Sequence, residues 1–136
     1  MNKVTALILT YNEEIHLQRC LDSIKKVAQK IYIIDSFSTD QTIDIAKEYK
    51  CDILFNKFKS HADQVNWALS NIDKKTDWIL RIDADEYLTD KLSNEINEKI
   101  PKIENYINGI YIPRRIKFQG KLIKHGGIFP VKIIRM

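Results

Sequence analysis

The chain has 136 residues, of which 44% are hydrophobic, and its formal net charge at pH 7 is +4. A chain of this size can bury one hydrophobic core, so we expect one domain. A membrane span needs a run of about 18 apolar residues, and a secretory signal needs an apolar region near the start. The sequence contains neither, which favours a cytoplasmic location.

The charge is unevenly distributed. The first 104 residues carry 15 basic and 18 acidic side chains, whereas from Asn105 onward there are seven basic side chains and no acidic one. This split suggests that the C-terminal part meets phosphates or an anionic membrane, with the inner face of the membrane as an alternative location. A solvated basic face explains the charge nearly as well. No nucleic-acid-binding motif accompanies it, so nucleic acid is disfavoured as a partner.

Cysteine and histidine give no sign of a structural metal or of a disulfide framework. Cys20 and Cys51 lie inside apolar patterns, which favours free thiols in a reducing compartment. The three histidines, His16, His61 and His125, show no zinc-ligand spacing, and we expect core or surface roles for them.

Apolar runs alternate with helical spacings over the first 100 residues. This alternation predicts a parallel sheet covered on both faces, with right-handed crossovers. We expect Glu13 and Glu14 to open the first helix, because acids in a first turn favour the helix dipole. Beyond residue 100, short strands and turns are expected over 109–116 and 121–136. The earlier elements are predicted as strands over 4–10, 31–34, 51–55 and 78–82, and as helices through 17–28, 43–49, 62–72 and 88–100.

Three of the predicted strands end in polar residues that suit ligand binding. The first is followed by Thr10-Tyr11-Asn12-Glu13, the second by Asp35-Ser36, and the fourth by Asp83-Ala84-Asp85-Glu86. Ligands of open α/β sheets bind at the carboxyl ends of the strands, so these tips predict a nucleotide-shaped cleft. No Gly-x-Gly-x-x-Gly or Walker lysine motif is present, which argues against a dinucleotide site and a P-loop.

The acids of the fourth tip suit a metal ion. Asp83 and Asp85 are two residues apart, so along an extended chain their side chains share one side. Mg²⁺ is characteristically held by one or two carboxylates together with substrate phosphates. Taken alone, the stretch is explained equally well as a solvated acidic turn.

At these tips the sequence resembles the family 2 glycosyltransferases. The resemblance is carried by ALILTYNEEIHLQRCLDSI, IYIIDSFSTDQTIDIAKEY and WILRIDADEYL, in that order. It implies a GT-A fold: a Rossmann-like, three-layer α/β domain with a mainly parallel sheet, followed by short strands. The pieces HADQVNWAL and FQGKLIKHGGIFPVKIIRM are similar to the subgroup that adds glucose or related sugars to lipopolysaccharide or lipooligosaccharide cores.

The resemblance also implies roles for the polar residues near the first and third helices. Thr10, Tyr11 and Glu13 would line the nucleotide pocket. Gln64 and Asn66 are further candidates for the nucleotide-sugar side, although an exposed polar helix end explains them equally well.

The remaining roles implied by the resemblance concern three aspartates. Asp35 would bind the base or ribose of the nucleotide. Asp83 would lie near the ribose and diphosphate and contribute to the metal site, and Asp85 would bind a divalent cation, Mg²⁺ or Mn²⁺, directly. The implied reaction moves a sugar from a nucleotide diphosphate, expected to be UDP and with glucose as one candidate sugar, onto a cell-envelope glycan or glycolipid with inversion.

The family's pattern places the general base beyond the segment where this sequence stops, so we expect the base to be absent. We therefore expect a nucleotide-sugar-binding half over 1–104 and the start of an acceptor-side segment over 105–136, truncated within the same domain. Two alternatives remain open, a nucleotide-sugar-binding module without turnover and a phosphatase with Asp83 as nucleophile. The oligomeric state is left open.

Overall fold

The computed structural model describes residues 3–122 and 131–136. The chain forms two compact units, Met1–Ile103 and Glu104–Met136. The first unit holds a four-stranded sheet with its helices, and the second holds short strands. Lys124, His125 and the Gly-Gly pair at 126–127 lie outside the described residues.

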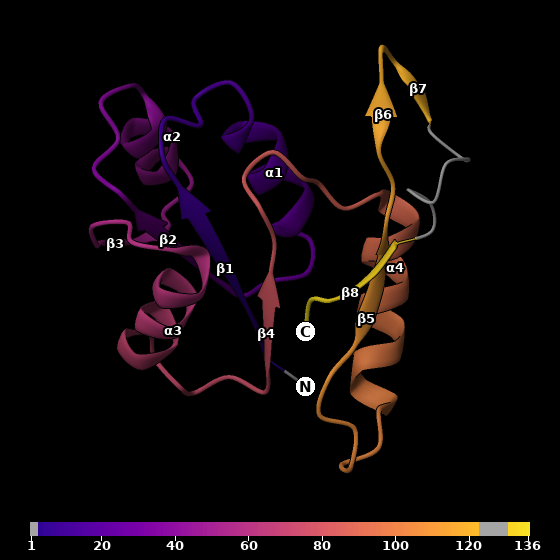
Figure 1. Ribbon diagram of the computed structural model, residues 1–136. Helices are drawn as coiled ribbons and strands as arrows, with labels where there is room; N and C mark the ends of the chain where they lie inside the picture. The colour runs from indigo at the N-terminus through magenta and orange to yellow at the C-terminus, as the bar shows by residue number, and fades with distance from the viewer. Residues whose placement is uncertain (1–2, 123–130) are drawn as a thin grey trace. The chain divides into compact units, whose positions relative to one another are not determined.

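The sheet of the first unit is parallel throughout, as the alternation of elements predicts (Figure 1). Its central strand, β1, is a nearly continuous apolar run, which is typical of a strand covered on both faces. The strand order is β3-β2-β1-β4. The strands are β1 (Val4–Thr10), β2 (Lys30–Asp35), β3 (Asp52–Phe55) and β4 (Trp78–Arg81).

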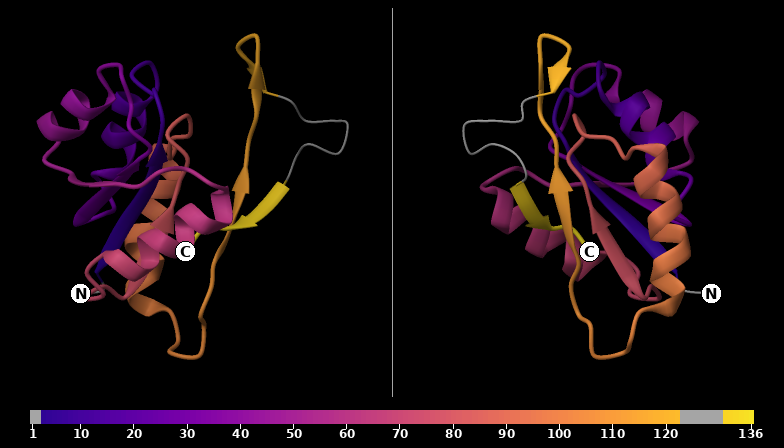
Figure 2. Two further views of the ribbon diagram at one scale, coloured as in Figure 1. Left: turned by 60° about the vertical axis from the view of Figure 1, so that its left-hand side comes forward. Right: turned by 90° about the vertical axis from the view of Figure 1, so that its right-hand side faces the viewer.

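Helices cover both faces of this sheet. Figures 1 and 2 show α1 (Leu17–Ile24), α2 (Thr42–Glu48) and α4 (Asp90–Lys99) on one face and α3 (His61–Asn71) on the other. The three-layer α/β fold is thereby confirmed. Between α3 and the sheet lies a core cluster of Leu7, Tyr32, Ile34, Ala68 and Ile72. Within the described residues, every helix is too short or too polar to cross a bilayer.

Helix α1 begins at Leu17, where its helical spacing begins, but Glu13 and Glu14 do not open it, and its first turn holds no acid. Glu13 and Glu14 lie in the preceding turn, where their backbone N–H groups donate to side chains at the start of α2 and in the loop before it. Glu13 N–H donates to Thr42 Oγ1 (2.8 Å), and Glu14 N–H donates to Asp40 Oδ2 (3.2 Å). These partners lie 29 and 26 residues away in the sequence, so a local pattern does not reveal them.

Side-chain caps set the starts of α3 and α4. Ser60 Oγ accepts from Asp63 N–H (3.1 Å), and Thr89 Oγ1 accepts from Leu92 N–H (3.2 Å). Helix α4 therefore starts at Asp90, two residues after the predicted start. Both caps satisfy N–H groups that have no partner within their own helix.

Replacing Ser60 or Thr89 with alanine is expected to lower the free energy of unfolding by about 1 kcal/mol each, because the capped N–H loses its acceptor. Urea denaturation measures this change. Ser70→Ala is the matched control: its hydroxyl donates to a carbonyl within α3, so a change within about 0.5 kcal/mol is expected. An equal loss in all three variants would contradict the capping role.

The second unit consists of short antiparallel strands. Strand β5 (Tyr111–Arg114) pairs with β8 (Val131–Ile134), and β6 (Lys117–Phe118) pairs with β7 (Lys121–Leu122). Two residues with positive φ, at 48° and 77°, connect β6 to β7, and the second of them is Gly120. This conformation is typical of a tight hairpin whose twist matches its strands.

Candidate functional site

An open pocket of about 290 Å³ lies at the carboxyl end of the sheet in the first unit. Its wall comes from four separate stretches of the chain, which the parallel topology brings to one edge. Five predicted site residues take part, namely Thr10, Tyr11, Glu13, Asp83 and Asp85. The other lining residues are Leu9, Ser36, Phe58, His61 and Ala84.

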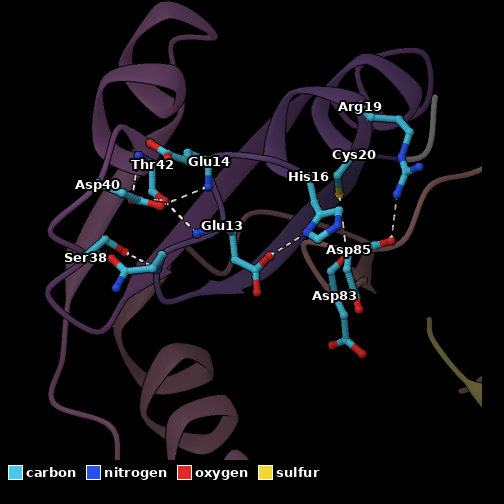
Figure 3. Close-up of polar contacts among 11 residues, drawn as sticks. Glu13, Glu14, His16, Arg19, Cys20, Ser38, Asp40, Thr42, Asp83 and Asp85 are labelled. Atoms are coloured by element: carbon cyan, nitrogen blue, oxygen red, sulfur yellow. Dashed lines mark hydrogen bonds and ion pairs between the residues drawn. The ribbon is translucent and has the colours of Figure 1, made fainter.

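One wall of the pocket is held by an interlock between the turn after β1 and the loop after β2 (Figure 3). Asn12 N–H donates to Ser38 Oγ (2.9 Å), and Asn12 Oδ1 accepts from Thr39 N–H (2.8 Å). Asn12 has a φ of 52°, which asparagine tolerates better than most residues. Burial alone would raise the pKa of Asp40, but hydrogen bonds from Thr42 lower it below its usual value. The charged carboxylate thus belongs to the interlock.

Asp35 lies beneath this wall and not on it. Its side chain is 0% exposed. Its Oδ1 accepts from Thr10 Oγ1 (2.7 Å) and Ser38 Oγ (2.6 Å), and its Oδ2 accepts from Ser38 N–H (2.7 Å). In this arrangement Asp35 joins the ends of the two strands, and its contact to a base or ribose stays a prediction.

The opposite wall is a tight turn that carries three acids. Glu86 N–H donates to Asp83 O (2.9 Å), and Asp83 N–H donates to the Glu86 carboxylate (3.0 Å). The segment is therefore a turn, and the extended geometry assumed for Asp83 and Asp85 was wrong. Both residues still line the pocket. Asp85 is exposed, whereas Asp83 is half-buried.

Helix α1 holds this acidic turn from behind. Figure 3 shows Arg19 and Cys20 reaching from the helix to the backbone of the turn. The Cys20 thiol lies 3.7 Å from Asp83 O, and Ser23 Oγ accepts from Leu88 N–H (3.0 Å). Burial, with the nearby carboxylates of Glu86 and Asp85, raises the pKa of Cys20 from 9.0 to about 12. This thiol is therefore a packing group and not a nucleophile.

Gln64 and Asn66 do not line the pocket. Gln64 is 1% exposed, and its amide bonds Asn56 and Ser36 at distances of 2.7 to 3.0 Å. Asn66 is exposed on α3. Their predicted contacts with a nucleotide-sugar remain predictions.

Five lining residues were not predicted as site residues, and two of these five, Phe58 and His61, carry rings. Their rings meet edge to face, with centroids 5.9 Å apart. Phe58 is 50% exposed, although it is large and apolar. One signal in the sequence could have identified this pair as site residues. The two residues lie just before and at the start of α3, after a strand that ends at the same sheet edge. Periodicity gave no signal, because Phe58 lies in the loop before α3 and His61 is the first residue of the helix.

The pocket offers the donor set of a hard divalent cation. Asp83 and Asp85 supply carboxylate oxygens on one wall. Among the residues that the structure describes, no three His, Cys, Asp or Glu side chains form a complete metal cage. A pair of carboxylates without a complete protein cage fits Mg²⁺ or Mn²⁺, which are often held by one or two carboxylates and by phosphate oxygens of a bound substrate. Asp83 and Asp85 would hold the ion here.

Comparison with known proteins gives a consistent result. The model of the family described as "Glycosyl transferase family 2" matches residues 5–127. An uncharacterised glycosyltransferase of Rickettsia bellii is 36% identical over 94 residues, which cover 69% of this chain and 31% of that protein. The lipopolysaccharide core biosynthesis glycosyltransferase LpsC of Rhizobium meliloti is 31% identical over 117 residues, covering 82% of this chain and 42% of that protein. The chain spans about a third of the length of the first of these relatives.

Solved structures show the same fold. TarS residues 1–349 of S. aureus, in complex with UDP-GlcNAc, superposes with a TM-score of 0.57 at 22% identity, covering 74% of this chain and 31% of that one. Glucosyl-3-phosphoglycerate synthase from Mycobacterium tuberculosis, in complex with Mn²⁺, UDP and glucosyl-3-phosphoglycerate, has a TM-score of 0.54 at 17% identity. That match covers 63% of this chain and 36% of the synthase chain.

Proposed function

Because the chain belongs to glycosyl transferase family 2, we propose that its pocket binds a UDP-sugar as the donor of a metal-assisted sugar transfer. The observation that carries this proposal is the meeting of two walls at one sheet edge. One wall is a turn with two carboxylates, and the other is lined by Thr10, Tyr11 and Glu13, of which Tyr11 exposes its aromatic ring. UDP-GlcNAc in the TarS complex and UDP in the synthase complex support the choice of nucleotide.

In this proposal the nucleotide lies along the wall formed by Thr10, Tyr11 and Glu13. Tyr11 is 61% exposed, so its ring is available to a base. The pair formed by Glu13 Oε2 and His16 Nδ1, 3.2 Å apart, orients the Glu13 carboxylate. Asp35 contributes to nucleoside binding indirectly, because its carboxylate holds the Thr10 side chain in place.

Asp83 and Asp85 hold the diphosphate end of the donor through a divalent cation. When bound, such a cation stabilises the negative charge of the departing diphosphate as a Lewis acid. The Mn²⁺ in the synthase complex supports this choice, and Mg²⁺ has the same ligand preference. Asp85 is the direct ligand in this proposal, because its side chain is exposed at the pocket.

The acceptor we propose is a cell-envelope glycan or glycolipid, with lipopolysaccharide core as the first candidate. The likeness to LpsC supports it. The second unit adds a feature that suits an anionic membrane: Arg114, Arg115, Lys117 and Lys121 are exposed there. Transfer with inversion also requires a base for the acceptor hydroxyl, and we assign that role to no residue of this chain.

A thermal-shift panel with UDP-, GDP-, ADP- and dTDP-sugars, each with and without Mn²⁺, tests the proposal. UDP-sugars with Mn²⁺ are expected to raise the midpoint most, because a ligand that binds only the folded chain stabilises it. Assays of UDP release then separate a transferase or hydrolase from a module that binds without turnover. No shift with any UDP compound would contradict the proposal. A larger shift with another nucleotide would show that the donor carries a nucleobase other than uracil.

A further inference from the structure

The acidic turn depends on a contact from outside its own segment. Residues 83–86 belong to neither a helix nor a strand, and hydrogen bonds between Asp83 and Glu86 close the turn. Arg19, on α1, reaches across: its Nη2 donates to the backbone oxygen of Asp85 at 3.1 Å, between residues 66 apart in the sequence. We propose that Arg19 is a positioning residue that fixes Asp85 for cation binding, an inference that rests on the proposed function.

The Arg19 side chain is itself held in place. Its guanidinium carbon lies 4.7 Å from the centre of the Tyr87 ring, within the range of a cation–π contact. Tyr87 follows the acidic turn directly, so Arg19 bonds the turn at Asp85 and rests on the residue two positions later. The planar guanidinium can donate and stack at once, which an ammonium group does less well.

The location of Arg19 allows an effect on the position of Asp85 to be distinguished from an effect on the stability of the fold. Its neighbours Cys20 and Ser23 contact the same segment from the same helix, but Cys20 is fully buried and Ser23 is half-buried. Arg19 is exposed, so truncating it opens no cavity in the core. The fold is therefore expected to survive its removal, while the backbone oxygen of Asp85 loses its hydrogen bond from α1.

The positive charge of Arg19 is a competing explanation for an effect of this residue on UDP binding, because an arginine near the pocket also attracts an anionic nucleotide. The two explanations differ in their dependence on metal. Attraction by charge strengthens UDP binding with or without Mn²⁺, and lysine preserves it. Positioning of Asp85 matters only when the cation is bound, and lysine preserves it poorly.

The test is calorimetric titration of UDP into the full chain, in Mn²⁺ and in its absence. For Arg19→Ala we expect roughly tenfold weaker binding in Mn²⁺, as is typical when a partner that orients a metal ligand is removed. Metal-free binding and the unliganded melting midpoint should stay unchanged. Arg19→Lys should remain impaired, Tyr87→Ala should resemble Arg19→Ala, and Tyr87→Phe should behave as wild type. Lys25→Ala, which removes another exposed cation of the α1 region, is the matched control.

The double variant Arg19→Ala/Tyr87→Ala should bind no more weakly than Arg19→Ala, because both changes remove one shared contact. Wild-type affinity in Arg19→Lys, or an equal loss with and without Mn²⁺ in Arg19→Ala, would overturn the positioning role. Unchanged binding in Arg19→Ala would overturn it as well. If the wild-type chain itself shows no Mn²⁺-dependent UDP binding, the proposed function fails, and this inference fails with it.

Discussion

Asp85→Ala is expected to abolish the Mn²⁺-dependent part of UDP binding while leaving the fold intact. Asp85 is exposed at the pocket, so its side chain adds little to the core. Its carboxylate is the proposed direct ligand of the cation, and the described residues supply no complete cage that would compensate. Calorimetry in Mn²⁺ should show UDP affinity falling to the value measured without metal.

Two comparisons make this result specific to the ligand. Asp85→Asn retains the size of the side chain and removes the charge, so most of the loss should persist. Asp90→Ala removes a nearby exposed carboxylate, which pairs with Lys26 outside the pocket, and should bind UDP as wild type does. Unchanged affinity of Asp85→Ala in Mn²⁺ would refute the assignment of this residue to the metal.

Replacing Asp35 with alanine should have the largest effect on stability. The variant leaves the Thr10 hydroxyl and the Ser38 hydroxyl and N–H without their buried acceptor. Unsatisfied buried groups cost about 1–3 kcal/mol each, and partial relaxation makes about 2–4 kcal/mol a reasonable total. Urea denaturation measures the loss. UDP and uridine should both bind more weakly by the same factor, because Thr10 loses its support.

Controls for Asp35 come from the same loop and the following helix. Ser38→Ala removes one of the three donors to Asp35, the Ser38 hydroxyl, while its N–H remains, and should cost about 1 kcal/mol. Asp44→Ala removes an exposed acid of α2 and should change stability within about 0.5 kcal/mol. A fall in UDP affinity without a fall in uridine affinity would show that Asp35 serves the diphosphate instead.

The order of strands and helices was predictable because burial on both faces of a parallel sheet leaves continuous apolar runs, as in Val4–Thr10. The same topology explains why the three polar tips were expected at one edge. The phosphatase alternative lost its basis once the family was shown over residues 5–127. Prediction was weakest where backbone groups find distant partners: Glu13 and Glu14 looked like a helix start because their acceptors, Thr42 and Asp40, are invisible to local patterns.

Side-chain orientation within the site was also beyond the sequence. Alternation along a strand placed Asp83 and Asp85 on one side, but the chain turns there, and Glu86 closes the turn. The burial of Asp35 depends on donors from Thr10 and Ser38, one of them 25 residues away. Such placements follow from tertiary packing, which residue spacing does not encode.

The pairing of β1 with β4 has a consequence for the order of folding. At the amino end of this pair, Lys3 N–H donates to Asp77 Oδ2 across 74 residues, so the pairing closes a long loop. Contacts of high sequence separation form slowly, because chain entropy is lost before they stabilise the fold. The acidic turn follows β4 closely, and this pairing brings it to the same sheet edge as the interlocked turn after β1. We therefore expect nucleotide binding to appear late in refolding, together with native β1–β4 contacts, and after the β1–β2 pair has formed.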